Sequence, residues 1–313
     1  MFNMFNMYNR IRTNKIVKKV VRHKWLYLLL IPVIAYYFIF CYIPIYGVTI
    51  AFKDYNMFKG IFGSKWVGFD NFKRIFSTSD FYRVVRNTFM LNLSSLVVGF
   101  PGPIILALLL NEVRVSKFKK LVQNFMYLPH FLSWVVIANI FIPMLSPSRG
   151  IINMAIKKLG GSPVYFMGNK IWWIAVYVGL GIWKEVGWSA IIYLAALTGI
   201  DQQLYEAAII DGAGKWKQCL NVTIPGIAPT ISVMLILRMG HIMNIGFDQA
   251  YLLGNNMVTE VSEVISTYVY SIGIVSLDIS RSSAIGFFQS IVCLVTLLIS
   301  NYASKKISGE SIY

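Results

Sequence analysis

The sequence predicts an all-α membrane protein with six transmembrane helices, and three observations support this fold class. Charged residues make up only 13% of the 313 positions and hydrophobic residues 57%, whereas about 25% of residues in soluble domains are charged. Six apolar stretches reach the roughly 20 residues that cross the hydrocarbon core of a bilayer. The net charge of +16 is spread along the whole chain, which is typical of attraction to anionic lipid headgroups.

The first predicted elements are a basic arm at residues 1–24 and a transmembrane helix. The arm holds seven basic residues and no acidic one, so the positive-inside rule places it in the cytoplasm. Residues 25–52 contain no charged side chain, and this run is far longer than the 7–15 apolar residues of a signal peptide. We therefore predict an uncleaved first span, which together with an extracellular loop makes up residues 25–82.

Residues 83–304 form the predicted core of the membrane domain. Three of its spans contain no charged residue, and the other two are interrupted only by Lys184 and Glu185 or by Arg238. Each span is long enough to cross the bilayer. The five core spans are predicted at about 87–111, 121–148, 171–200, 225–247 and 282–304.

Two further segments complete the topology. The apolar segment 258–277 has only 14 uncharged residues after Glu263, which is too short to span. We expect it to form a surface or re-entrant helix. Because six is an even number of spans, the tail at 305–313 is predicted to lie in the cytoplasm with the N-terminal arm.

The chain lacks the motifs of several functional classes. Its one Gly-Lys pair, Gly214-Lys215, has Ile209 where a phosphate-binding loop needs its first glycine. Its three histidines and three cysteines do not follow the spacing of a metal site. Basic residues are not gathered on one patch, so a nucleic-acid partner is not expected. We expect no cofactor, no metal and no catalytic residue in this chain.

The polar segment 201–224, between the fourth and fifth spans, carries the most specific pattern. Glu206-Ala207-Ala208 is followed by three residues, Gly212, nine residues, and Val222-x-Ile224-Pro225. This spacing resembles the signature of permease subunits in binding-protein-dependent ABC importers, and Asp211-Gly212-Ala213 resembles the carbohydrate-uptake, maltose-permease-like branch. Six further motifs resemble the subgroup that serves lipoprotein-bound complex oligosaccharides: Tyr-Ile-Pro-x-Tyr-Gly (42–47), Ala-Phe-Lys-Asp-Tyr-Asn (51–56), Asn-Glu-Val-Arg (111–114), Tyr-Leu-Pro-His-Phe (127–131), Trp-Lys-Glu-x-Gly-Trp (183–188) and Gly-Phe-Asp-Gln (246–249).

The resemblance implies the type I ABC importer permease fold, in which this loop forms a cytoplasmic coupling helix that docks on an ATPase. Two small alanines allow close approach, Gly212 permits a bend after the last turn, and Asp201 is placed to cap the helix start. Glu206 would accept hydrogen bonds, and Pro225 would mark the re-entry into the membrane. The alternative is an ordinary amphipathic loop. The predicted ATPase-coupling residues are Glu206, Ala207, Ala208, Asp211, Gly212 and Pro225.

The same resemblance implies the partners and the location. We expect a second permease subunit, an ATP-binding-cassette ATPase dimer that binds the ATP, an extracellular solute-binding lipoprotein and an oligosaccharide substrate. The outer loops at 53–86 and 246–281 are long enough to contact the binding protein. The chain is expected in the plasma membrane of a bacterium, with both termini cytoplasmic. The alternative is a self-sufficient secondary transporter or a membrane-embedded enzyme that uses the intramembrane charges.

Ionisable residues inside the spans are the candidates for a substrate path. Four polar residues fall on one face of a continuous fifth helix, and three residues of the fourth span form a polar and aromatic cluster in which tryptophan could stack on sugar rings. The alternative is a structural polar network between spans. The candidates are Arg238, His241, Asn244 and Asp248 on the fifth span and Lys184, Glu185 and Trp188 on the fourth.

Overall fold

The computed structural model describes residue 19 and residues 22–308. Most of the predicted basic arm, at 1–18 and 20–21, and the end of the tail, at 309–313, lie outside the described residues. The chain divides into two compact units, Met1–Gly68 and Phe69–Tyr313.

The first unit contains the predicted first span. This span is one helix over Lys24–Phe52. It is made of the consecutive segments α3 (Lys24–Tyr37), η1 (Phe38–Tyr42), α4 (Ile43–Ile45) and η2 (Tyr46–Phe52). The loop that follows holds a short antiparallel pair, β1 (Lys53–Asp54) and β2 (Lys65–Trp66), with α5 (Gly60–Gly63) between them. Lys53 Nζ donates to the carbonyl of Ile61 at 2.7 Å, which ties α5 to β1.

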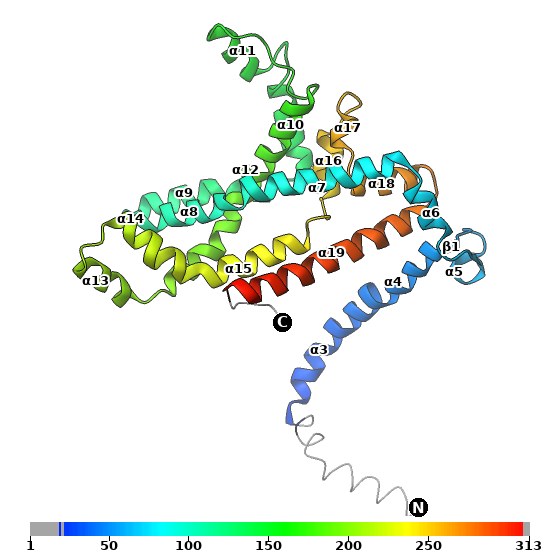
Figure 1. The fold of residues 1–313 in the computed structure, drawn as a ribbon, viewed down its shortest axis with the longest axis horizontal. Coiled ribbons are helices and arrows are strands. Elements are labelled where there is room, and N and C mark those ends of the chain that lie inside the picture. The colour runs from blue at the N-terminus through cyan, green and yellow to red at the C-terminus, as the bar shows by residue number, and fades with distance from the viewer. Residues whose placement is uncertain (1–18, 20–21, 309–313) are drawn as a thin grey trace, which may run out of the picture. The chain divides into compact units, whose positions relative to one another are not determined.

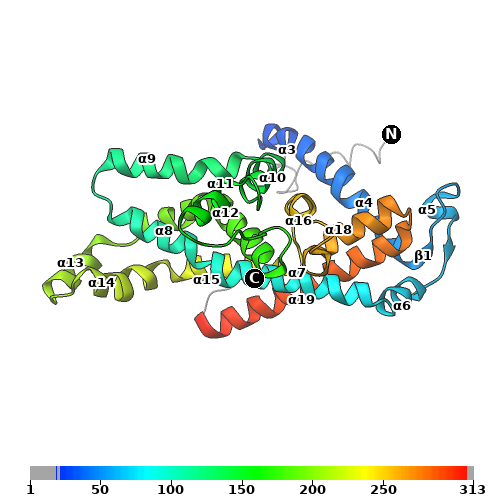
Figure 2. The ribbon, with the colours of Figure 1, turned by 90° about the horizontal axis from the view of Figure 1, so that it is seen from above.

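The second unit is a bundle of helices in which α12 is central (Figure 1). Helix α12 packs against α7, α8, α9 and α15, and α15 packs in turn against α19 (Figure 2). The elements of this unit are α6 (Asp70–Phe76), α7 (Ser79–Gly99), α8 (Pro101–Glu112), α9 (Ser116–Tyr127), η3 (Leu128–Phe131), α10 (Trp134–Met144), α11 (Ile151–Lys158), α12 (Lys170–Thr198), α13 (Gln202–Ile210), α14 (Lys215–Gln218), η4 (Cys219–Thr223), α15 (Ile224–Gly240), α16 (Phe247–Leu253), α17 (Thr259–Ser262), α18 (Ile265–Tyr270), η5 (Ser271–Val275) and α19 (Ile279–Ser308).

Five helices of the described chain are long and apolar enough to cross a membrane, or six if one bent pair counts as a span. The five helices are Lys24–Phe52, Ser79–Glu112, Lys170–Thr198, Lys215–Gly240 and Ile279–Lys306. The prediction of an all-α membrane protein is confirmed. The segment 258–277 does not span, as predicted, because its apolar helix covers only Ile265–Val275.

The predicted third span, 121–148, is not one straight helix. The chain bends by 100° between Ser116–Phe131 and Trp134–Met144. Pro129 has no N–H to continue the helical ladder and lies in the 3-10 turn η3. Ser133 then adopts an extended conformation and caps α10, because its Oγ accepts from Val136 N–H at 3.3 Å. A proline and a new N-cap therefore divide an apolar run that composition alone treats as continuous.

The bounds of the predicted fifth span, 225–247, also differ from the structure. The helix already begins at Lys215 and runs through Pro225, so this proline does not mark the start of the span. The π turn η4 lies just before Pro225, and in it the amide of Ile224 donates to Cys219 O. Such a turn changes the usual pattern of backbone hydrogen bonds in a helix. The helix ends at Gly240, where a glycine disfavours continuation.

The core of the second unit surrounds α12. Trp173 is fully buried, its Nε1 donates to the carbonyl of Leu253 at 2.8 Å, and its ring stacks on Tyr177 with centroids 5.1 Å apart. Farther along α12, Ala190 and Tyr193 belong to a second buried cluster with residues of α8 and α15. The buried cluster around Trp173 and the one around Tyr193 hold α12 against the neighbouring helices, which together surround a polar cavity.

Candidate functional site

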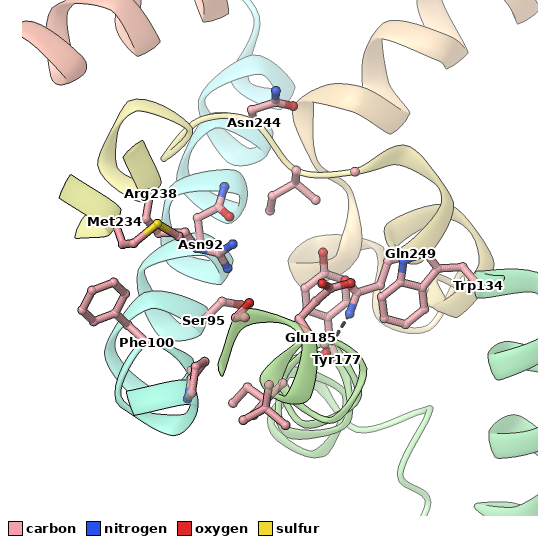
Figure 3. A pocket seen from close by; sticks show the side chains of 18 of the residues that line it. Asn92, Ser95, Phe100, Trp134, Tyr177, Glu185, Met234, Arg238, Asn244 and Gln249 are labelled. Atoms are coloured by element: carbon pink, nitrogen blue, oxygen red, sulfur yellow. Dashed lines mark hydrogen bonds between the residues drawn. The ribbon is translucent and has the colours of Figure 1, made fainter. Parts of the chain in front are cut away.

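A cavity of about 320 Å³ lies between α7, α8, α10, α12, α15 and α16 (Figure 3). Its aromatic walls come from Phe100, Trp134, Tyr177 and Tyr193. Polar side chains from four helices and from the linker between α15 and α16 also line it. The main polar groups are Asn92, Ser95, Glu185, Arg238, Asn244 and Gln249. A mixture of rings and separated polar groups is the usual lining of a small-molecule site.

Two side-chain amides position α16 and the linker between α15 and α16, residues 241–246, next to the cavity. Asn92 Nδ2 donates to the carbonyl of Ile242 at 2.8 Å, and Gln249 Nε2 donates to the carbonyl of Tyr177 at 2.8 Å. The second bond is the dashed line in Figure 3. Since both bonds satisfy backbone carbonyls next to the cavity, these amides position its wall as well as line it.

The predicted polar stripe on a continuous fifth helix is wrong. Helix α15 ends at Gly240, and a turn follows in which Asn244 N–H donates to the carbonyl of His241 at 2.8 Å. Arg238 reaches the cavity from the last turn of α15, and Asn244 reaches it from the linker. His241 and Asp248 are exposed and do not line this cavity.

Lys184, predicted on the substrate path, instead holds the bend between η3 and α10. Its side chain is buried at 8% exposure. Its Nζ donates to the carbonyl of His130 at 2.5 Å and to that of Leu132 at 2.7 Å. These carbonyls have lost their helical donors at the break, so the ammonium group replaces them. For this residue, the structure agrees with a structural polar contact.

Trp188 and Glu185 contact the same bend. The Trp188 ring stacks on His130, with centroids 4.5 Å apart and planes 2° apart. His130 Nδ1 lies 3.0 Å from Glu185 Oε2. Trp188 does not line the cavity, whereas Glu185 does. The predicted cluster on the fourth span is therefore divided between a clamp on the bend and a single acidic group at the cavity.

The close approach of α9 to α12 depends on Gly187. A Cβ atom at this position would lie 2.0 Å from the carbonyl oxygen of Met126. Only glycine allows the two backbones to come so close. Packing of α9 against α12 therefore explains why the Trp-Lys-Glu-x-Gly-Trp motif has a glycine at this position.

Sequence reasoning missed several lining residues because they are neutral. Asn92, Ser95 and Gly99 follow each other at offsets of three and four on α7, and all three line the cavity. This spacing places them on one helix face. A search for polar or small residues at helical spacing within an uncharged span would have found this face.

The loop between the fourth and fifth spans forms the predicted capped and bent helix. Asp201 Oδ1 accepts from Gln203 N–H at 3.0 Å, which caps α13. At the other end Gly212 has φ +74°. Ala213 N–H donates to Ala208 O at 2.9 Å and Gly212 N–H to Ile209 O at 3.0 Å. These two bonds form a Schellman motif, in which the residue after the C-cap, here Gly212, adopts the left-handed conformation.

A chain of hydrogen bonds braces α13 against the next helix. Tyr205 OH lies 3.0 Å from Thr223 Oγ1, and Thr223 Oγ1 donates to Gln218 O at 3.3 Å. Gln218 Nε2 donates to Ala213 O at 2.7 Å, immediately after the Schellman turn. The segment Tyr205–Ala213 is therefore attached at each of its ends to the helix that begins at Lys215.

The outer surface of this loop is exposed and partly apolar. Helix α13 has no buried residue, and Glu206 is exposed. A hydrophobic surface on a helix that projects from a bundle marks an interaction site. The large exposed apolar side chains of α13 and α14 are Leu204, Ile209, Ile210 and Trp216.

Comparison with known proteins gives consistent similarities. A family model for the binding-protein-dependent transport system inner membrane component matches residues 81–309. The chain is 46% identical over 292 residues to Protein LplB of Bacillus subtilis (strain 168), covering 93% of this chain and 92% of that protein. It is 42% identical over 307 residues to the polygalacturonan/rhamnogalacturonan transport system permease protein YteP of the same organism, covering 98% and 96%.

A solved structure has a similar chain. The crystal structure of a bacterial alginate ABC transporter in complex with alginate pentasaccharide-bound periplasmic protein contains a chain with a TM-score of 0.87 and 38% identity. The match covers 96% of this chain and 100% of that chain.

Proposed function

The chain belongs to the family of binding-protein-dependent transport system inner membrane components, and from this we propose that it is one permease of an ATP-driven oligosaccharide importer. It is a multi-pass membrane protein and the permease subunit of a carbohydrate ABC importer. The observation that carries the proposal is the similarity over nearly the whole chain to YteP, named for polygalacturonan and rhamnogalacturonan, and to the alginate transporter.

The cavity between α7, α12 and α15 is the proposed site of passage. Amide, hydroxyl and charged side chains can bond sugar hydroxyls there, and the aromatic rings can contact the apolar faces of sugar rings. Of the residues predicted on the path, Glu185, Arg238 and Asn244 would contact the substrate. Lys184 and Trp188 would act by holding the bend that forms one wall.

The loop at 201–224 is the proposed docking element for the ATPase. Its supports are the exposed apolar side chains of α13, the bend at Gly212 and the brace to Thr223. In this proposal Glu206 accepts hydrogen bonds from the ATPase, and the alanines allow close contact. Closure of the ATPase on ATP would move the loop, and the brace would carry the displacement into the fifth span.

The proposed assembly has a second permease subunit, an ATPase dimer that holds the ATP, and an external solute-binding lipoprotein. This chain then has no ATP site of its own. The location is the plasma membrane of a bacterium, with the coupling loop and both termini in the cytoplasm. The segments 53–86 and 246–281 would face the binding protein.

The test is a reconstituted assembly with Glu206→Ala in this chain. We expect the variant to assemble normally but to lose substrate-stimulated ATP hydrolysis and uptake, because the docking bond is absent. Lys120→Ala, which removes an exposed charge from α9 outside the loop, serves as the matched control and should keep both activities. Unchanged coupling in Glu206→Ala would contradict the docking role.

A second experiment separates the importer from the self-sufficient transporter. The purified chain alone, in liposomes without an ATPase, should take up no oligosaccharide. Uptake by the chain alone would support a secondary transporter that uses the intramembrane charges.

A further inference from the structure

The two charged side chains that line the cavity form no ion pair with each other. Among the residues that the structure describes, two charged side chains line the cavity, Glu185 and Arg238. Glu185 already interacts with His130, whose Nδ1 lies 3.0 Å from its Oε2. The backbone carbonyl of Arg238 accepts from His241 N–H at 3.2 Å, but its guanidinium makes no hydrogen bond or ion pair with another side chain in the described part of the chain. The nearby Lys184 donates hydrogen bonds to two carbonyls at the bend and does not line the cavity.

The guanidinium of Arg238 is exposed at the cavity rather than buried in the bundle. Figure 3 shows Arg238 entering from α15 beside Asn92 and Ser95, with Glu185 entering from α12. The last turn of a helix favours a positive charge, so the residue is tolerated there without a partner in this chain. Its donors nevertheless stay available on the cavity side.

The chemistry of this group selects an anion. A guanidinium presents several N–H donors in a rigid fork that matches the two oxygens of a carboxylate. It has no acceptor and remains charged, so a neutral hydroxyl satisfies it less well than a carboxylate does. The side chains of Ser95 and Asn244 also make no hydrogen bond to other described residues, and they could bond the hydroxyls of the same sugar.

We propose that the cavity takes an oligosaccharide of uronic acids and that Arg238 binds a sugar carboxylate. This inference rests on the proposed function, because it names the substrate class of the same cavity. Arg238 is then the residue that determines specificity, while the aromatic walls and neutral polar groups accept the parts common to all sugars.

The test uses the complete importer with its own binding protein in proteoliposomes. The probes are trimers of galacturonate, mannuronate and glucuronate, each beside its methyl ester, which removes the charge and keeps the ring. Wild type is compared with Arg238→Gln and Arg238→Lys. Since the binding protein is the same throughout, any difference between variants arises in the permease.

We expect Arg238→Gln to raise the KM for the transported acidic trimer by about 10-fold to 100-fold, the usual effect of losing a hydrogen bond to a charged group. Transport of the ester should stay within about twofold of wild type, and Arg238→Lys should fall between the two. Equal losses for acid and ester would overturn the specificity role.

Two other outcomes are also decisive. If neutral trimers enter as well as acidic ones in wild type and in Arg238→Gln, the uronate inference fails while the proposed importer stands. If an intact wild-type assembly imports no carbohydrate at all, the proposed function fails. Loss of assembly in Arg238→Gln with recovery in Arg238→Lys would show that Arg238 pairs with another subunit, which also overturns the inference.

Discussion

Replacing Lys184 with methionine is expected to destabilise the bend between η3 and α10. Methionine has nearly the same length as lysine but no donor. The carbonyls of His130 and Leu132, which now accept from Nζ at 2.5 and 2.7 Å, would lose their partner. In the interior of a membrane protein no bulk water replaces it.

The size of the effect follows from these two bonds. Each buried carbonyl left without a donor costs about 1–3 kcal/mol. Removing an ammonium that is only 8% exposed recovers part of this cost, because a buried charge is itself unfavourable. We expect a net loss of about 2–4 kcal/mol in the free energy of unfolding. Glu185→Gln is the matched control, because the contact with His130 is partly exposed and should contribute under about 1 kcal/mol.

Two measurements check this prediction. Thermal unfolding of the purified protein in lipid nanodiscs should show a lower midpoint for Lys184→Met than for Glu185→Gln. Amide hydrogen exchange should rise at residues 128–134, where the carbonyls lose their donor. If Lys184→Met unfolds and exchanges like the control, the ammonium does not hold the bend, and the structural assignment of Lys184 is wrong.

Three further predictions concern packing, coupling and pH. Gly187→Ala should prevent folding and accumulation in the membrane, because its Cβ would lie 2.0 Å from a backbone carbonyl of α9, whereas Gly179→Ala on the same helix meets nothing within 4 Å and should accumulate normally. Tyr205→Phe removes the 3.0 Å contact with the next helix, worth about 0.5–1.5 kcal/mol; it should lower the number of substrates imported per ATP, and an unchanged ratio would exclude a coupling role for the brace. The hydrogen bond from Lys170 lowers the pKa of Glu260 below its usual value, so the contact stabilises α17 at neutral pH and is lost as the pH falls through that lowered pKa; the protection of α17 amides, measured relative to the intrinsic exchange rate at each pH, should fall in acid in wild type but show no such step in Glu260→Gln.

Much of the fold could be predicted from local properties of the sequence. The apolar runs matched the helices at Lys24–Phe52, Ser79–Glu112 and Ile279–Lys306, because the length of a hydrophobic run is set by the bilayer. The cap and the turn of the loop at 201–224 could also be predicted from neighbouring residues. The cap at Asp201 and the left-handed Gly212 were expected because few residue types adopt those conformations.

The site was predicted less well because helix ends inside apolar runs are not visible in hydropathy. The stripe from Arg238 to Asp248 assumed a helix that in fact ends at Gly240. The third span was assumed straight, although it bends by 100°. Lys184 was predicted on the substrate path because it is a charged residue inside a span, and its two carbonyl partners come from a bend that hydropathy does not show.

The sequence by itself determined a membrane-spanning helical chain with a capped and bent loop, because run length, caps and glycine turns depend on neighbouring residues. Only the tertiary structure decided which polar groups share the cavity. That choice depends on where α9 and α15 end and on how α7, α12 and α16 pack, and it leaves Arg238 facing the cavity while Lys184 is used by the bend.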